Sequence, residues 1–173
     1  KTVLFFAGGK FGLGKSRTLE IFNTFVNDFN NIQVIAISGK NKKMYEEFNQ
    51  IVKIANKTDF IKVFEFVNNV PELMAGLDVV ITKPGGLTTT ESLVSGLPMI
   101  IINPIPGQEE ENAQFLEHSN VGIWLKKQMN ITETISNFLS DDEKLKEMKE
   151  NTKKISNRNS TKDICTILEA GLN

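Results

Sequence analysis

The sequence lacks the features that mark membrane-spanning, disulfide-bonded or nucleic-acid-binding proteins. It has one cysteine, Cys165, so no disulfide can form within the chain, which suits a reducing cytoplasm. No apolar run approaches the roughly 20 residues that a membrane-spanning helix requires. The formal net charge is −1, so no general excess of positive charge favours a nucleic-acid partner. The single histidine, His118, is not surrounded by a cluster of metal-ligating residues, and we expect no metal site.

What remains is the composition of an ordinary globular domain. The chain has 173 residues, of which 40% are hydrophobic and 24% charged. This length most simply makes one domain with a full core. The chain begins at Lys1 and enters an apolar run at once, so we expect it to be a piece of a longer protein.

The apolar runs alternate with segments of helical spacing. Six runs have the pattern of strands, at residues 2–7, 32–38, 60–67, 78–82, 99–102 and 121–125. This alternation predicts an α/β fold, with a Rossmann-like six-stranded parallel sheet and helices on both faces. An amphipathic helix is expected at residues 161–172, with Cys165 packed within it. In such a sheet, ligands bind at the carboxyl ends of the strands.

The first candidate site is the glycine-rich turn after the first strand. Residues 9–16 match the P-loop pattern, in which Lys15 would pair with phosphates and Ser16 would hold Mg²⁺. A P-loop enzyme also needs an acidic residue at the carboxyl end of a strand. The only strand-associated aspartate, Asp78, opens its strand and so lies at the other edge. A tight strand–helix turn, or a loop that touches a pyrophosphate without metal, would explain the same glycines.

The second candidate is the segment Lys-Pro-Gly-Gly-Leu-Thr-Thr-Thr-Glu that begins at Lys83. The paired glycines Gly85 and Gly86 let the backbone approach a ligand, and the helix that follows would direct free N–H groups at an anion. Glu91, one turn into that helix, could accept hydrogen bonds from two ribose hydroxyls. Thr88 and Glu91 also have the spacing of a capping box, which would need no ligand. The spacing alone does not separate these two interpretations.

The third candidate opens the helix after the fifth strand. Gln108, Glu109 and Asn112 lie on one helical face and offer both donors and acceptors, as a sugar ring would require. Acidic residues at a helix start are also favourable without any ligand, because they complement the helix dipole. The loops after strands one, four and five thus suggest phosphate, ribose and sugar. Together they predict a nucleotide-sugar site that needs no metal.

Two stretches carry a resemblance to a known family. AGGKFGLGKS at residues 7–16 and DVVITKPGGLTTTESLVSGLPMIIINPIPGQEEENA at residues 78–113 resemble the C-terminal donor-binding domain of two-domain (GT-B) glycosyltransferases. More narrowly, the chain is similar to lipid glycosyltransferases, namely bacterial processive diacylglycerol glucosyltransferases and plant monogalactosyldiacylglycerol synthases. The resemblance covers residues 2–125. It implies that residues 1–173 form a single donor-binding domain, one half of a GT-B enzyme.

The resemblance also implies roles for particular residues. Gly12 would face the diphosphate, and the strand exit at Phe66 and Val67 would hold uracil. The helix start at residues 86–88 would bind phosphate, and Glu91 would bind the ribose hydroxyls. The remaining donor-binding residues come from the glycine loop, the turn after strand four and the hexose-binding face. The full expected set is Gly9, Gly12, Lys15, Phe66, Val67, Lys83, Gly85, Gly86, Leu87, Thr88, Glu91, Gln108, Glu109 and Asn112.

The implied activity is transfer of a hexose from UDP-glucose or UDP-galactose to a lipid such as diacylglycerol. In the family the N-terminal domain binds the acceptor, supplies the catalytic base and contacts the membrane. That domain is absent here, so we expect no catalytic residue, metal or cofactor in this chain and no activity in isolation. The helix at residues 161–172 would pack across the domain junction in relatives, so its apolar face would be exposed here. The full-length enzyme would lie in the cytoplasm, on the inner face of the cell membrane.

Three alternatives stay open. The first is a P-loop NTPase-like nucleotide-binding domain. The second is an N-acetylglucosaminyltransferase of the lipid II type, although the pair Gln108 and Glu109 departs from the polar set of those relatives and favours a plain hexose. The third is a non-catalytic nucleotide-binding module.

Overall fold

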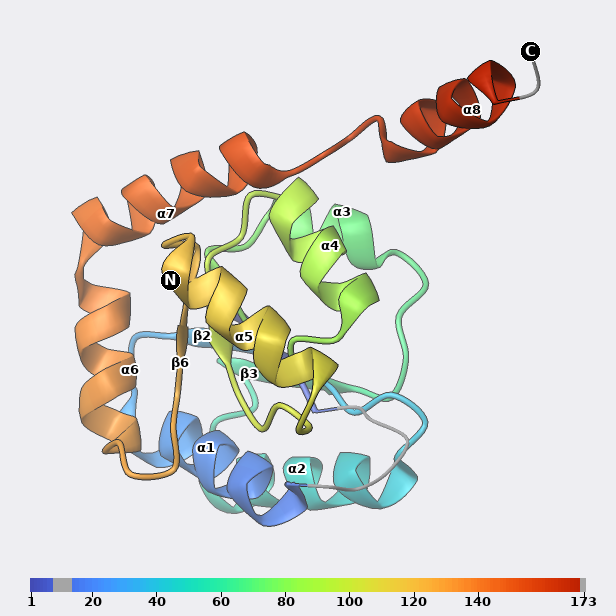
Figure 1. Cartoon of the computed structure of the whole chain (residues 1–173). Coiled ribbons are helices and arrows are strands. Elements are labelled where there is room, and N and C mark those ends of the chain that lie inside the picture. The colour runs from blue at the N-terminus through green and yellow to red at the C-terminus, as the bar shows by residue number, and fades with distance from the viewer. Residues whose placement is uncertain (8–13, 172–173) are drawn as a thin grey trace.

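The fold is built on a parallel sheet (Figure 1). A computed structural model describes residues 1–7 and 14–171 of the chain. Within these residues six strands pair in the order β3-β2-β1-β4-β5-β6, and every neighbouring pair is parallel. The strands are β1 (Thr2–Phe6), β2 (Gln33–Ile37), β3 (Ile61–Phe64), β4 (Val79–Thr82), β5 (Met99–Ile101) and β6 (Gly122–Trp124). The predicted α/β class and the six strands are confirmed.

The third strand is shorter than predicted. The sequence pattern extended it through Val67, whereas β3 ends at Phe64. Its neighbour β2 ends at Ile37, and the last bond between the two runs from the Ser38 amide to the Phe64 carbonyl (2.9 Å). The apolar residues after Phe64 have no neighbouring strand, so they form no strand–strand hydrogen bonds and β3 ends there. Phe66 therefore lies in the connection that leads to the next helix.

Helices cover both faces of the sheet (Figure 1). α1, α2 and α6 pack on one face, and α3, α4 and α5 pack on the other. α7 packs against the first group and crosses the amino edge of the sheet to reach α4. The helices are α1 (Lys15–Asp28), α2 (Lys42–Ile54), α3 (Val70–Ala75), α4 (Gly86–Val94), α5 (Gln108–His118), α6 (Ile131–Ser140), α7 (Asp142–Ile155) and α8 (Ser160–Ala170).

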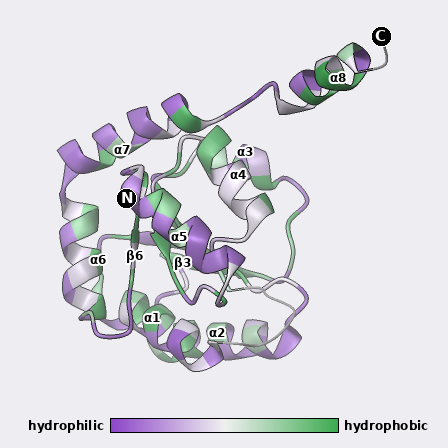
Figure 2. Cartoon of the chain, viewed as in Figure 1, coloured by the Kyte–Doolittle hydropathy of each residue, from purple (hydrophilic) through white to green (hydrophobic). Residues whose placement is uncertain are grey.

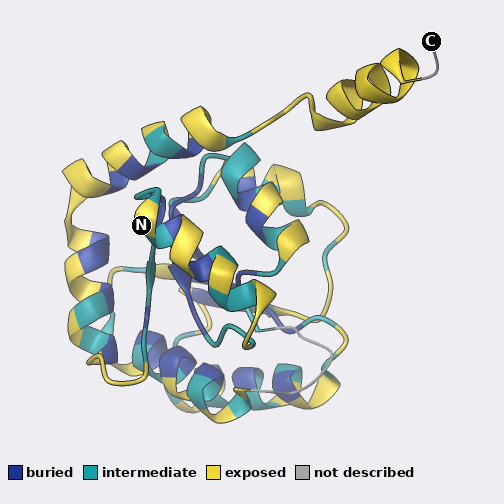
Figure 3. Cartoon of the chain, in the orientation of Figure 1, coloured by how far each residue is buried: buried dark blue, intermediate teal, exposed yellow. Residues whose placement is uncertain are grey.

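The sheet is buried on both faces, as continuous apolar strands require (Figure 3). In β1, Val3 and Phe5 belong to the core under α1 and α2, whereas Leu4 belongs to the core on the opposite face. The Phe5 ring meets Phe22 of α1 edge-on, with centroids 5.6 Å apart, and Phe22 stacks on Phe48 of α2 at 3.8 Å. Truncation of such a buried ring typically costs about 3–5 kcal/mol of unfolding free energy. The centre of the sheet is thus a rigid support for the loops at its edges.

The last two helices differ in their attachment. α7 is tied to the amino edge of the sheet, where Lys1 pairs with Asp142 and Lys149 Nζ lies 3.6 Å from Asp78 Oδ1. The hydrogen bond from Lys1 lowers the pKa of the Asp142 carboxyl. α8 projects away from the domain (Figures 1 and 3), and each of its residues is exposed.

The exposed surface of α8 includes a hydrophobic side (Figure 2). Ile164, Ile167 and Leu168 are 58%, 71% and 62% exposed. Cys165 is exposed as well, so the expectation that it packs was wrong, because no other element covers this helix. Within the described residues, no helix combines the length and apolar character needed to cross a membrane.

Candidate functional site

The central strands bring three helix-starting loops to one edge of the sheet. β1 and β4 are neighbours, paired at Phe5 and Ile81, and β5 lies beside β4, paired at Ile81 and Ile100. From β1 the sheet continues to β2 and β3 on one side and from β4 to β5 and β6 on the other. This reversal makes the carboxyl ends of β1 and β4 a topological switch point, the usual place for a ligand crevice.

α4 begins directly after the glycine pair, and no side chain caps its start. Gly85 is the N-cap residue, with φ −69° and ψ 149°. The first backbone bond of the helix runs from the Thr89 amide to the Gly85 carbonyl (2.9 Å). The three preceding amides, at residues 86–88, have no acceptor among the described residues. Half-buried Lys83 lies just before this turn. An anion could therefore accept hydrogen bonds directly from the helix start.

The capping-box interpretation of Thr88 and Glu91 is wrong. α4 starts at Gly86, so Thr88 is the third residue of the helix and cannot be its N-cap. The helix therefore begins three residues earlier than the box would require. Glu91 lies in the second turn and is half-buried. Its carboxylate makes no hydrogen bond or ion pair with another residue that the structure describes, so its acceptor oxygens are open to a ligand.

The loop after β5 is held against the loop after β4. Gly107, with φ 97°, is the N-cap of α5, and again no side chain caps the helix. Glu109 Oε2 accepts from the Ile105 amide (2.8 Å), whereas a Cβ built on Gly85 would lie 3.9 Å from Glu109 Oε1. Asn112 Nδ2 donates to the Pro84 carbonyl (2.8 Å). The second and third candidate segments thus form one continuous surface.

Comparison with known proteins shows the family of the chain. A model of the glycosyltransferase family 28 C-terminal domain matches residues 10–165. The chain belongs to this family. It is 34% identical over 169 residues to a processive diacylglycerol beta-glucosyltransferase of Bacillus pumilus, and 35% identical over 164 residues to the protein of the same name from Bacillus subtilis. These matches cover 98% and 95% of the chain but 42% of each relative. The chain therefore spans less than half the length of these family members.

Solved structures show the same fold. Acinetobacter baumannii MurG superimposes with a TM-score of 0.79 over 98% of this chain and 49% of its own, at 16% identity. Anabaena Alr3699/HepE in complex with UDP-glucose gives a TM-score of 0.68 over 89% of this chain and 43% of its own, at 18% identity. The predicted GT-B half-domain architecture is confirmed.

The remaining residues of the expected family 28 donor site are placed as follows. Gly9 and Gly12 lie outside the described residues. Phe66 is 66% exposed in the connection between β3 and α3, whereas Val67 is partly buried and packs on the core under α3. Gln108, the first residue of α5, is exposed.

Lys15 does not point toward the other candidate segments. It is the first residue of α1, and its Nζ is 2.7 Å from Glu47 Oε1 of α2. Asp78 lies at the amino edge, where its Oδ2 accepts from the Thr2 amide (2.9 Å). The P-loop alternative thus lacks both its lysine and its carboxyl-edge acid, and the structure does not support it. Among the described residues, no group of three or more His, Cys, Asp or Glu side chains could hold a metal ion.

One site-edge residue escaped the sequence analysis. Asn103, directly after β5, has a left-handed φ of 46°. Its Nδ2 donates to the Gly14 carbonyl (3.2 Å) and to Thr18 Oγ1 (3.1 Å), which joins the start of α1 to the β5 loop. A signal existed in the sequence, because Asn is among the few non-glycine residues that adopt this conformation readily. Its partners are about 90 positions away, so no local pattern could reveal the contact.

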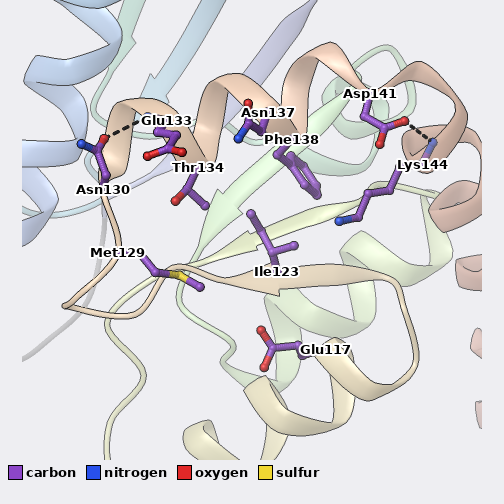
Figure 4. A pocket seen from close by; sticks show the side chains of 10 residues that line it. All are labelled: Glu117, Ile123, Met129, Asn130, Glu133, Thr134, Asn137, Phe138, Asp141 and Lys144. Carbon is purple, nitrogen blue, oxygen red and sulfur yellow. Dashed lines mark hydrogen bonds between the residues drawn. The ribbon is translucent and has the colours of Figure 1, made fainter.

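A hollow of about 460 Å³ lies beside β6, between α6 and the end of α5 (Figure 4). Several of its polar groups already have structural partners. Asn130 accepts from the Glu133 amide and so caps α6, and Asp141 accepts from the Lys144 amide and so caps α7. Glu117 accepts from the Trp124 amide at the strand edge. We assign no ligand to this hollow.

Proposed function

We propose that this chain is the UDP-sugar-binding half of a glycosyltransferase that moves a hexose from UDP-hexose to a lipid such as diacylglycerol. The observation that carries the proposal is the start of α4. There three amides and the Glu91 carboxylate lie one helical turn apart, and none of them has a partner among the described residues. Phosphate and ribose hydroxyls match these groups in charge and hydrogen bonding. The names of the similar Bacillus proteins support a lipid acceptor.

The nucleotide end of the site would also assist the chemistry. As the bond between the hexose and UDP breaks, negative charge grows on the β-phosphate. The amides at residues 86–88 and the positive end of the α4 dipole would stabilise that charge, with Lys83 as an additional cation. These donors are already oriented by the fold, so they need no rearrangement during the reaction. Lys15 could contribute only after leaving Glu47.

The sugar end would be formed by the start of α5. Gln108 is exposed and offers both a donor and an acceptor. Glu109 uses Oε2 to hold the loop and keeps Oε1 beside Gly85 for a hexose hydroxyl. Asn112 would act indirectly, because its amide nitrogen already donates to Pro84. This acceptor-rich set favours a plain hexose over an N-acetylated sugar.

The other half of the reaction would belong to a domain outside this chain. We infer that this domain binds the lipid acceptor, supplies the catalytic base and contacts the inner face of the cell membrane. The share of the relatives that the chain spans, 42%, leaves room for such a domain. Closure of the two domains would exclude water and align the acceptor.

A calorimetric screen tests the proposal. The chain is titrated with UDP, UDP-glucose, UDP-galactose, UDP-N-acetylglucosamine and ATP, in the presence of EDTA. We expect UDP, UDP-glucose or UDP-galactose to bind, and UDP-N-acetylglucosamine and ATP to bind more weakly. Binding of ATP alone, or binding that EDTA abolishes, would contradict the proposal. Sugar transfer to diacylglycerol by the isolated chain would contradict the division between two domains.

A further inference from the structure

Three non-glycine residues in the described part of the chain have a positive φ, and all are asparagines: Asn56 (54°), Asn103 (46°) and Asn120 (49°). Asn56 and Asn120 come directly after the C-caps of α2 and α5, where a left-handed residue commonly ends a helix. Asn103 ends no helix, since it follows a strand. Its unusual backbone therefore needs another explanation.

The side chain of Asn103 supplies that explanation. Its Nδ2 donates two hydrogen bonds, to the Gly14 carbonyl and to Thr18 Oγ1, and Thr18 Oγ1 in turn donates to the Gly14 carbonyl (3.0 Å). Contact is so close that a Cβ built on Gly14 would lie 2.7 Å from Asn103 Cγ. The exit of β5 is thus packed directly against the start of α1, with no space for a side chain at Gly14.

The segment that begins at Asn103 leads to the proposed hexose-binding residues. Its far end is fixed by Glu109, which accepts from the Ile105 amide. The helix on the other side of the Asn103 contact, α1, begins at Gly14 without a side-chain cap. Its first amides could therefore donate to the diphosphate of the same ligand. Asn103 therefore joins the element that would hold the hexose to the element that would meet the diphosphate next to it.

We propose that Asn103 is a positioning residue, which fixes the start of α1 relative to the β5–α5 loop so that one UDP-hexose can contact both. This inference rests on the proposed function. The affinity of a ligand that lacks the hexose, such as UDP, depends little on how α1 is placed relative to the β5–α5 loop. A ligand that spans both sides, such as UDP-glucose, loses affinity when the two sides can shift.

Two variants of Asn103 separate positioning from backbone effects. Asn103→Gly allows the left-handed backbone but removes the amide. Asn103→Asp keeps the size and the backbone tolerance but replaces the donating nitrogen by an acceptor. Asn120→Gly is the matched control, because it makes the same change at a left-handed asparagine whose Nδ2 bonds Glu147 (2.8 Å), at the amino ends of the strands.

The experiment is isothermal titration of each variant with UDP and with UDP-glucose, together with thermal unfolding. Both Asn103 variants are expected to bind UDP-glucose about five- to tenfold more weakly, the usual range for loss of one to two hydrogen bonds, and UDP within about twofold of the parent. Asn120→Gly is expected to lower the melting temperature without changing the ratio of the two affinities.

Two unfavourable results are distinguishable. If the parent chain binds both ligands and the Asn103 variants weaken both equally, or neither, Asn103 is a structural residue and the inference is overturned. If the parent chain binds neither UDP nor UDP-glucose, the proposed function fails, and the role of Asn103 in donor binding is overturned with it.

Discussion

Six helices of this domain begin in one of two ways. α1, α4 and α5 begin at Gly14, Gly85 and Gly107, and none of these residues has a side chain that could accept from the first amides. α2, α6 and α7 begin at residues whose side-chain oxygen accepts from the amide three positions on, namely Asn41, Asn130 and Asp141. α3 has a third solution, because Pro71 in its first turn has no amide hydrogen to satisfy.

The two kinds of helix start occupy different places. The glycine starts follow β1, β4 and β5, three adjacent strands at the switch point. The capped starts of α2 and α6 follow β2 and β6, on either side of that group, and α7 follows another helix. An unsatisfied helix start costs stability, and a cap typically restores about 1 kcal/mol. Side-chain caps are thus missing at the three starts where a ligand could supply the acceptors and present at α2, α6 and α7. α8, which projects from the domain, also starts without a side-chain cap.

The largest effect is expected at Glu91. Glu91→Gln should weaken UDP binding roughly 10- to 100-fold, because hydrogen bonds to a charged group typically contribute about 1.5–3 kcal/mol. The melting temperature should change little, since no described residue pairs with this carboxylate. Calorimetry and thermal unfolding measure the two effects separately. Glu143→Gln, at an exposed position in the first turn of α7, is the control. A loss of stability without a loss of UDP affinity would return Glu91 to a structural role.

At the capped helix starts we expect a smaller effect, which falls on stability and not on UDP affinity. Asn41→Ala removes the acceptor of the Met44 amide (3.1 Å) and should lower the free energy of unfolding by about 1 kcal/mol. UDP affinity should not change, because α2 begins outside the group of glycine starts. Denaturant unfolding and UDP titration of the same variant provide the measurement. A marked fall in UDP affinity would show that the donor site extends to the capped start of α2.

The smallest effect on stability is expected when a cap is added to the open start of α4. Gly85 already has the extended backbone of an N-cap, and a Cβ there would make only ordinary contact with Glu109. Gly85→Ser should therefore raise the free energy of unfolding by a few tenths of a kcal/mol. UDP should bind several-fold more weakly, because the hydroxyl competes for the amides that the phosphate would use. UDP binding that is unchanged or tighter would contradict the assignment of this turn to phosphate.

Local sequence signals were sufficient for the order of the strands and helices and for the glycine turns after β4 and β5. Local signals failed where the same residue spacing was compatible with two different structures. Thr88 and Glu91 satisfied the capping-box pattern, and only the observed start of α4 at Gly86 removed it. The extent of β3 was likewise decided by the length of its neighbour and not by its own apolar residues.

The sequence by itself determined the α/β class, the existence of six strands and the glycine-containing turns after β4 and β5, because each depends on residues within about ten positions of one another. Tertiary structure alone decided which side chains meet. It paired Lys15 with Glu47, joined Asn112 to Pro84, and placed the Asn103 amide on the start of α1. These contacts join residues 28 to 89 positions apart, so they exist only once the parallel strands have brought their carboxyl ends to one edge.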